Sequence, residues 1–403
     1  MNKAFFINGG AGRVLCSMPG LEKFAEKNDD FIIVAESWGE LYLLNRKLRN
    51  HVYQGVHKGL FHEKLKDRKI ISPEPYRVNQ YFNQKCNLIQ AFDIEINELD
   101  DVRETGKLNL ELSKLEQITG YNLVAEVRGV LQKDKIVVFQ PFGQSCKKEG
   151  DFIFDTSGRS FEVSNVLEIL KELNKNYGVI IMSEVEIPGW QNLGVACPQG
   201  MSLNDWAGVI NAADYFLGCD SVGQHLANAV GKPATVVTGS TFPENISYPD
   251  NKKFTIIDNG KDARRYVPIR MTMDIFLDRD SEDLMVLKPD TVKKVCKSVK
   301  DKIGLGRNMN TGQLIHDKTK EGPSGKQLPS SVCNDVVSGG YPKKTLLPST
   351  SKSFTPTGMM PQNSLKKDSG PIKYTGFKKT KANDSKKKPI DAIIEQEMKS
   401  KNS

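Results

Sequence analysis

Short apolar runs alternate with amphipathic stretches over the first 305 residues. Each apolar run is bounded by charged residues or glycine and has the length of a strand buried in a parallel sheet. One amphipathic stretch begins at Ser202 with Asp205 three residues later, which is typical of a capped helix start. The pattern predicts strands over residues 4–8, 31–36, 136–140, 179–182, 215–218 and 234–238, and helices over 14–27, 40–48, 77–92, 114–131, 163–174, 202–212, 222–230 and 291–303.

The alternation of strands and helices occurs twice, with a restart near residue 133. Repeated βα units predict an α/β protein with two doubly wound, Rossmann-like domains, over residues 1–133 and 134–305. Ligands of such sheets bind beyond the carboxyl ends of the strands, so we expect both domains to turn their functional loops toward a shared cleft. Residues 306–403 are rich in Ser, Thr, Pro, Gly, Asn and Lys, and we expect them to form a disordered tail.

The positive charge of the chain lies in this tail. The whole chain has a net charge of +8, whereas residues 307–403 have 18 basic and 8 acidic residues, which leaves 39 basic and 41 acidic residues in the remainder. The body is close to neutral, so the basic character says little about its ligand. The tail is either a solubilising segment or a contact for nucleic acid, for an anionic membrane surface or, through residues 390–398, for a protein.

Composition argues against several classes of protein. No apolar run is long enough for a transmembrane helix, and the first apolar run is too short for a signal peptide, so we expect a cytoplasmic protein. The seven cysteines are widely spaced, without a CxxC motif or a Cys/His ligand spacing. This favours free thiols over disulfides or a structural metal, and we expect neither a metal nor a cofactor.

A glycine-rich turn, Asn8 to Arg13 (NGGAGR), joins the first predicted strand to the first predicted helix. Glycines allow a tight turn and a close approach to a ligand, and a helix amino end favours an anion. A tight turn without a ligand is the alternative. The turn is not GxGxxG, which makes an NAD-dependent oxidoreductase a distant hypothesis, and GxxxxGK[ST] is absent, which excludes a P-loop.

A second candidate loop follows the predicted strand over residues 215–218. Asp220 closes this buried segment, and Ser221, Val222 and Gly223 open a helix, with His225 about one turn further on. Free N–H groups and the helix dipole at such a position would hold a diphosphate. Asp220 would bind a sugar hydroxyl or cap the helix.

A third candidate loop follows the predicted strand over residues 136–140. It contains Gly143 and Ser145, and Arg159 lies shortly before the next predicted helix. Small polar groups and one guanidinium beside a helix start suit a phosphate. Arg159 is equally compatible with an ordinary surface position.

These segments together resemble the heptosyltransferase-type family of glycosyltransferases, which has the GT-B fold. The family's run Gly-Asp-Val-Leu-x-Ser/Thr-x-Pro-x-Leu is matched by residues 12–21 (GRVLCSMPGL), and its Asp-Thr-Gly-x-x-His by residues 220–225 (DSVGQH). A small-rich helix, a Gly-x-Pro strand and a glycine-containing loop follow, as in the family. The resemblance spans roughly residues 5–305, is most specific over 198–249 and does not cover the tail.

The resemblance implies an inverting, metal-independent transfer of a sugar from a nucleotide-diphosphate donor bound to the second domain. It places the diphosphate at residues 221–223 and the sugar at Asp220, with Thr241 in a loop that closes on the donor. With the loops described above, the candidate donor-binding residues are Gly12, Gly143, Ser145, Arg159, Asp220, Ser221, Val222, Gly223, His225 and Thr241.

The chain departs from the family at its proposed catalytic base. The family has an Asp after the N-terminal glycine, and this chain has Arg13. Arginine stays charged at neutral pH and cannot act as a base, so Arg13 would instead clamp an anionic acceptor or the donor phosphates. A replacement base would come from Glu36 or His57. Without one, the chain would be a non-catalytic sugar-nucleotide-binding or interaction protein.

Residues 72–84 are polar and aromatic and lie in the domain that would hold the acceptor. Tyr76, Arg77 and Asn79 are the candidate acceptor-binding residues, because such side chains suit sugars or nucleotide bases, although a mixed surface is an equal explanation. The family's usual acceptor is a lipopolysaccharide-type glycan at a membrane. Some bacteriophage DNA glycosyltransferases are similar to this group, which makes a modified DNA base the second acceptor. Arg13 and the basic tail slightly favour a polyanionic acceptor.

Overall fold

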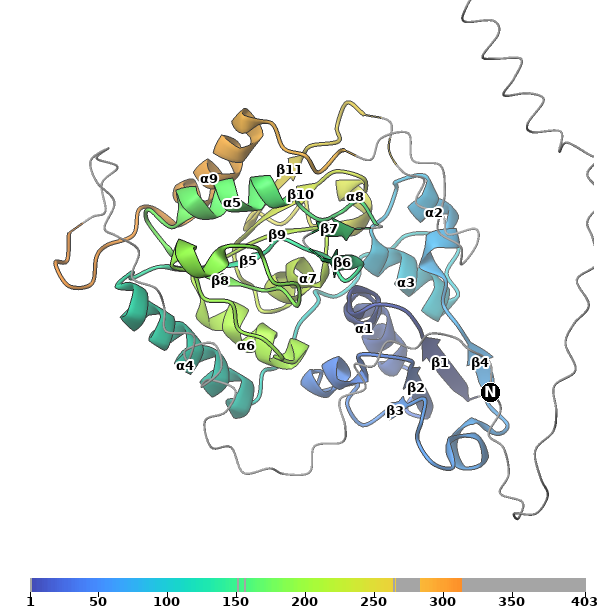
Figure 1. The fold of residues 1–403 in the computed structure, drawn as a ribbon. Coiled ribbons are helices and arrows are strands. Elements are labelled where there is room, and N and C mark those ends of the chain that lie inside the picture. Colours follow the sequence, from blue (N-terminus) through green and yellow to red (C-terminus); the bar gives the residue numbers. More distant parts are fainter. Residues whose placement is uncertain (1, 151, 156, 264, 266–282, 314–403) are drawn as a thin grey trace, which may run out of the picture. The chain divides into compact units, whose positions relative to one another are not determined.

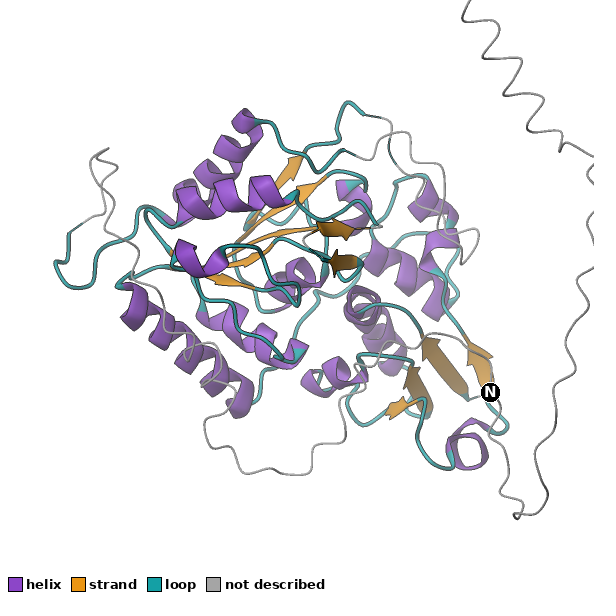
Figure 2. Ribbon diagram, viewed as in Figure 1, coloured by secondary structure: helices purple, strands orange, loops and turns teal. Residues whose placement is uncertain are grey.

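A computed structural model describes residues 2–150, 152–155, 157–263, 265 and 283–313. These residues form two parallel β-sheets, the helices that pack on them and one antiparallel hairpin (Figures 1 and 2). The mixed α/β architecture agrees with the alternating sequence pattern. The predicted tail lies outside the described residues from residue 314 onward, and so does the segment proposed as a docking peptide.

The first sheet has the strand order β3-β2-β1-β4, with every pair parallel. Side chains of β1 alternate between two faces, as expected for a strand: Phe5 and Ile7 lie in the core with α1 and α3, whereas Ala4 packs with Leu60 of the short π-helix η2. Strands β2 and β3 are added on one side of β1, and β4 is added on the other. The switch point, where the strand order reverses, therefore lies between β1 and β4. The elements of this part are β1 (Lys3–Ile7), α1 (Ala11–Ala25), β2 (Phe31–Ala35), η1 (Gly39–Leu44), β3 (Val52–Gln54), η2 (Leu60–Leu65), β4 (Lys69–Ile71), η3 (Pro75–Arg77), α2 (Asn79–Phe82) and α3 (Leu88–Asn97).

The second sheet has the order β11-β10-β9-β5-β8, which is the order of flavodoxin-like sheets, and its switch point lies between β5 and β9. Helices cover both faces (Figure 2). Helices α5 and α9 pack on one face, while α6 and α7 pack on the other together with α4. The elements are α4 (Lys114–Leu131), β5 (Ile136–Gln140), β6 (Cys146–Glu149), β7 (Phe152–Asp155), α5 (Val163–Leu173), β8 (Gly178–Ile181), η4 (Trp190–Leu193), α6 (Leu203–Ala212), β9 (Tyr215–Cys219), α7 (Val222–Ala229), β10 (Ala234–Thr238), α8 (Pro243–Ile246), β11 (Phe254–Asp258) and α9 (Pro289–Ile303).

All six predicted strands are present within about one residue of their predicted ends, and so are the helices predicted over residues 114–131, 163–174, 202–212 and 222–230. The predicted capped start is confirmed, since Ser202 and Asp205 form a reciprocal capping box. The prediction of one helix over 77–92 is wrong, because the chain breaks at Gln84, which has a φ of +58°, and restarts at the Asn87 cap. The predicted helix over 40–48 is a shorter 3-10 helix, η1.

Helix α4 belongs by its packing to the second sheet. It packs along α6, where Gly120 and Gly208 bring the two backbones together, and it also lies beside β5 and β8. The predicted domain boundary near residue 133 falls after this helix. Residues 306–313, predicted as the start of the tail, instead return to the body, where Asn308 forms a β-bridge with Lys133.

Candidate functional site

The loops after β5 and β9 meet at the switch point of the second sheet. Gln140, the last residue of β5, accepts the backbone N–H of Gly223 at 2.8 Å through its side-chain oxygen and donates to the hydroxyl of Ser221 at 3.2 Å. Gln140 therefore serves as the cap of α7, since the side chain of Ser221 makes no capping bond. The N–H of Gly223, expected to be free for a diphosphate, is already bonded within the protein.

Asp220 is buried directly after β9. One carboxylate oxygen accepts from Gln224 at 2.7 Å, and the other accepts from the Thr241 hydroxyl at 3.0 Å and lies 3.7 Å from the Arg159 guanidinium. Burial raises the pKa of Asp220 above its ordinary value, and the charge of Arg159 and the two hydrogen bonds offset only part of that effect. The structure thus brings three candidate residues, Asp220, Thr241 and Arg159, into one cluster, at the edge where ligands of such sheets bind.

The loop that carries Arg159 is organised by Asp155 at the end of β7. Its carboxylate accepts from the backbone N–H of Arg159 at 3.1 Å and from the Ser160 hydroxyl at 2.7 Å. The Ser160 hydroxyl oxygen in turn accepts from the N–H of Gly143 at 2.9 Å, which ties the loop after β5 to the Arg159 loop. Ser145 lies in the same loop and is half-buried.

His225 of α7 lies against α1, with only 5% of its surface exposed. Its Nδ1 is 2.7 Å from the Tyr248 hydroxyl and 3.6 Å from the Cys16 sulfur. Its other edge faces Gly12, where an added Cβ would lie 3.1 Å from Cδ2 and 3.3 Å from Nε2. Burial, with a smaller contribution from the positive charge of Arg159, lowers the pKa of His225 to about 4, so the ring is neutral at pH 7.

Arg13 has a packing role in this structure. Its guanidinium donates to the Asn8 carbonyl and side chain, to the Pro73 carbonyl and to the Glu74 carboxylate, at 2.9–3.1 Å. Four of its five N–H groups are thus engaged. It also lies 5.1 Å from the centre of the Tyr76 ring and is 5% exposed. Arg13 joins the loops after β1 and β4, and clamping an anion would require it to give up some of these contacts.

The two candidate bases follow strands of the first sheet, β2 and β3. Glu36, after β2, is exposed and accepts the N–H of Gly9 at 3.3 Å. His57, after β3, is exposed and packs edge-on against Tyr53. Within the described ranges, no hydrogen bond or ion pair joins either side chain to Asp220. Glu36 lies one strand nearer to the switch point than His57 does.

The acceptor candidates lie around η3 and α2. Tyr76 is half-buried under the Arg13 guanidinium and makes an edge contact with Tyr81, whereas Arg77 and Asn79 are exposed. Asn79 accepts a bond from Asn83 one turn later.

Sequence reasoning missed four residues that build the site: Gln140, Asp155, Gln224 and Tyr248. Asn245 was missed as well; it donates to the carbonyls of Tyr81 and Cys86 and so ties α8 to the α2 region. The sequence contained one signal for Gln140, because it is the polar last residue of a buried strand. Tyr248 had none, since only the fold brings it to His225.

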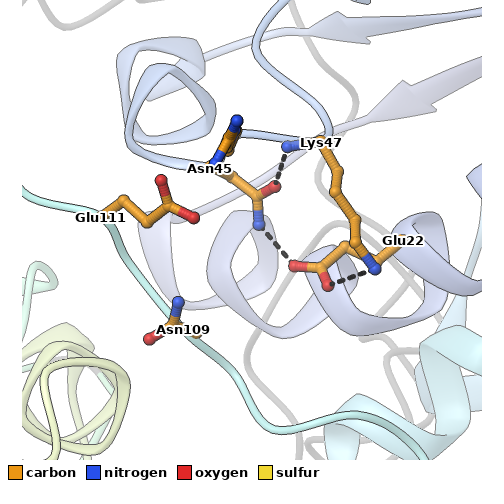
Figure 3. A pocket seen from close by; sticks show the side chains of 6 residues that line it. Glu22, Asn45, Lys47, Asn109 and Glu111 are labelled. Carbon is orange, nitrogen blue, oxygen red and sulfur yellow. Dashed lines mark hydrogen bonds and ion pairs between the residues drawn. The ribbon is translucent and has the colours of Figure 1, made fainter.

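The described residues contain no cluster of His, Cys, Asp and Glu that would hold a metal ion. No helix among them is long and apolar enough to cross a membrane. A pocket of about 130 Å³ lies beside α1 and η1 (Figure 3). Its walls include Glu22, Asn45 and Glu111, and none of the candidate site residues lines it.

No known family's sequence profile matches the chain, and no curated protein sequence matches it. Solved structures do match. The glycosyl transferase family 9 protein from Veillonella parvula DSM 2008 has a TM-score of 0.54 and 11% identity, over 74% of this chain and 96% of its own.

The chain has a GT-B fold. ADP-heptose lps heptosyltransferase II of E. coli matches with a TM-score of 0.46 and 13% identity, over 64% of this chain and 90% of its own. E. coli heptosyltransferase WaaC, solved with ADP, matches with a TM-score of 0.43 and 12% identity, over 75% and 99%. The two parallel sheets and the similarity to the Veillonella parvula protein confirm the expected GT-B-like fold.

Proposed function

We propose that this chain transfers a sugar from a nucleotide-diphosphate donor to a polar or anionic acceptor, with inversion and without a metal. The observation that carries the proposal is the buried Asp220 cluster at the switch point of a GT-B second sheet. A fold alone hosts many activities, so the site must carry the functional argument. Here a carboxylate, a hydroxyl and a guanidinium converge where such sheets bind ligands.

Each member of the cluster has a distinct task in this proposal. Asp220 accepts a hydroxyl of the transferred sugar. Arg159, whose side chain is about one-third exposed, neutralises the diphosphate as it leaves. The dipole of α7 adds positive potential at the same edge, although Gln140 occupies the N–H of Gly223.

We assign the general base to Glu36 in preference to His57. Glu36 follows β2, the direct neighbour of β1, and its carboxylate reaches Gly9 beside the amino end of α1. His57 follows β3, one strand further from the switch point. A carboxylate within reach of an acceptor hydroxyl suffices for proton removal, as geometry comes before pKa in such assignments.

The experiment is a thermal-shift screen of a panel of nucleotide-diphosphate sugars against the full chain and Asp220→Asn. One donor should stabilise the wild type, and the variant should lose most of that shift. Asp301→Asn, which removes a surface carboxylate of α9, is the matched control and should keep it. If no nucleotide sugar stabilises the wild type while a dinucleotide does, the transferase proposal fails.

Transfer itself is then assayed with DNA that contains modified bases and with lipopolysaccharide-type glycans, in the presence of EDTA. Glu36→Gln should reduce turnover while leaving the donor-induced shift unchanged.

A second candidate function, sugar-nucleotide binding without turnover, is favoured by one observation: Arg13 fills the position of the family's acid. Donor binding with neither transfer nor hydrolysis on any acceptor would support that candidate.

A further inference from the structure

Helix α4 has a second apolar face, away from the one that packs on α6. Leu115 is 57% exposed, Ile118 54% and Tyr121 64%. They follow one another at intervals of three residues, so they share one side of the helix. In Figure 1, α4 lies on the outer side of α6. Large apolar side chains gathered on an exposed helix face indicate an interaction surface.

This face continues along α4 as a seam of five positions. Leu115, Ile118, Asn122, Ala125 and Gly129 are separated by alternating steps of three and four residues, which is the spacing of the contact positions in a coiled coil. Ala125 is half-buried and the other four are exposed. None of the five is charged, whereas the solvent side of a surface helix ordinarily carries charged residues. The seam is therefore typical of a helix that packs against another helix.

The two halves of the seam differ in side-chain size. Leu115 and Ile118 form its amino-terminal half, and Ala125 and Gly129 form its carboxyl-terminal half. A Cβ on Gly129 would meet nothing within 4 Å, so the space above it is open. Two antiparallel copies set the large half of one helix on the small half of the other. Two parallel copies would press the large halves together and leave a gap between the small halves, which close packing disfavours.

The charges beside the seam favour the same direction. Lys114 is exposed at the amino end of α4, where the dipole of its own helix is positive. An antiparallel partner places Lys114 beside the carboxyl end of the second α4, where the dipole is negative, whereas a parallel partner would bring the two Lys114 ammonium groups together. Arg128, in the last turn, is already paired with Asp214 at 2.8 Å.

We propose that the exposed face of α4 is the contact between two copies of this chain, which pack these helices antiparallel about a two-fold axis beside Asn122. Asn122 is the midpoint of the seam, so an axis there gives the longest overlap and lets the two amides hydrogen-bond to each other. A stable interface involves about 20–30 residues a side, and this face provides far fewer, so we expect a dissociation constant on the order of tens of micromolar. The proposal does not depend on sugar transfer.

The first test is sedimentation equilibrium of the full chain from about 1 to about 500 µM, which brackets that constant. The average mass should rise from 45.0 kDa toward twice that value. Ile118→Glu should stay monomeric, because the dimer would bury two unpaired carboxylates. Val286→Glu is the matched control, since its side chain has nearly the same exposure, 52% against 54%, and it should dimerise like the wild type.

A second variant separates the interface from folding. Gly129→Leu should weaken the dimer roughly tenfold or more, because it overfills the space that receives Leu115 of the other copy. Its thermal stability at low protein concentration should not fall, because the new side chain meets open space and leucine favours a helix more than glycine does. A loss of dimer in this variant therefore cannot be a loss of fold.

Single cysteines on the seam test the direction of packing. Asn122→Cys should give a disulfide-linked dimer with oxidised glutathione, because the two copies of this position meet at the axis. Leu115→Cys should not, since its two copies lie about 21 Å apart along the helix axis. Both variants also carry Cys333→Ser, which removes the cysteine outside the described residues; the others are buried or half-buried.

A wild type that keeps the monomer mass throughout, or a cross-link at Leu115→Cys but not at Asn122→Cys, would overturn the proposal. A monomeric wild type that binds phosphatidylglycerol vesicles, with binding lost in Ile118→Glu, would assign the face to a lipid surface instead. A monomeric wild type whose residues beyond 313 are cut faster by trypsin in Ile118→Glu would assign it to the carboxyl-terminal segment of the same chain.

Discussion

The side-chain oxygen of Gln140 accepts the backbone N–H of Gly223, so the strand on one side of the switch point caps the helix on the other. Gly223 must lack a side chain for this contact, because a Cβ there would lie 2.4 Å from that oxygen and 2.5 Å from the Phe216 ring. The Gln140 amide thus adds a side-chain link between the loops after β5 and β9 to the pairing of their strands.

Gln140→Ala should therefore destabilise the protein by about 1–3 kcal/mol, because the buried N–H of Gly223 loses its acceptor. Urea unfolding at pH 7 measures the change. Gln144→Ala, an exposed residue of the same loop, is the control and should have little effect. Equal stability of the two variants would mean that Gly223 finds another acceptor.

The contact of α4 with α6 should not tolerate a methyl group. A Cβ on Gly120 would lie 2.2 Å from the Gly208 carbonyl, and one on Gly208 would lie 2.1 Å from the Glu116 carbonyl. We expect Gly120→Ala and Gly208→Ala each to cost about 3 kcal/mol or more, since the helices must move apart. Gly129→Ala on the same helix should instead stabilise by up to about 1 kcal/mol through helix propensity. Thermal unfolding of the three variants gives the comparison, and a neutral Gly120→Ala would show that α4 does not pack as described.

Restoring the family's acid at position 13 should not create a base. Arg13→Asp removes the bonds to Asn8, Pro73 and Glu74 and places a carboxylate beside Glu74, so we expect a loss of at least about 3 kcal/mol and no gain in transfer. Arg13→Lys should also destabilise the protein, because one ammonium group cannot make the hydrogen bonds of a planar guanidinium. Arg49→Ala, at an exposed residue outside the candidate site, is the control and should change neither stability nor transfer. A folded Arg13→Asp variant with faster transfer would contradict this role.

His225 should make stability depend on pH. Its folded pKa of about 4 lies below the ordinary value, so the unfolded chain takes up the proton first as the pH falls. The stabilisation is present above about pH 6.5 and is lost on the way down to about pH 4. We expect the free energy of unfolding to fall by roughly 2 kcal/mol more between pH 7 and pH 5 in the wild type than in His225→Gln.

Urea unfolding at the two pH values measures this difference, and His62→Gln, at an exposed histidine, should behave like the wild type. Asp220 gives stability the opposite pH dependence, because its pKa is raised in the folded protein. The contribution of His225 is therefore isolated only by comparing the variants with the wild type. Identical slopes in wild type and His225→Gln would contradict the assignment of a neutral, buried ring.

Strong local signals allowed the fold to be predicted. β5 was found within residues 136–140 because five consecutive buried residues leave little choice, and α4 was found because its apolar residues recur at helical spacing. The strands that were missed, such as β3 and β4, have only three residues each, none of which is fully buried. The break at Gln84 was missed because a left-handed residue other than glycine has no sequence signature.

The site could be predicted only in part. Asp220 and Thr241 follow two adjacent parallel strands, so strand ends alone bring them to one edge. The partners of His225 could not be found, because Cys16 and Tyr248 are 209 and 23 residues away in the chain. Arg13 was assigned a ligand role from its motif position, whereas two of its four hydrogen bonds go to a loop some 60 residues later.

Residues 304–308 are held against the body of the protein after α9 ends. Arg307 donates its N–H to Asp134, Tyr177 donates to the Gly304 carbonyl, and Asn308 pairs with Lys133. Asp134 precedes β5, so this anchor lies at the amino edge of the second sheet, while Asp220 lies at the carboxyl edge. An affinity tag, fluorophore or surface linker attached beyond residue 313 is therefore joined to the protein at the edge remote from the candidate site, which makes that end the natural handle for immobilised binding measurements.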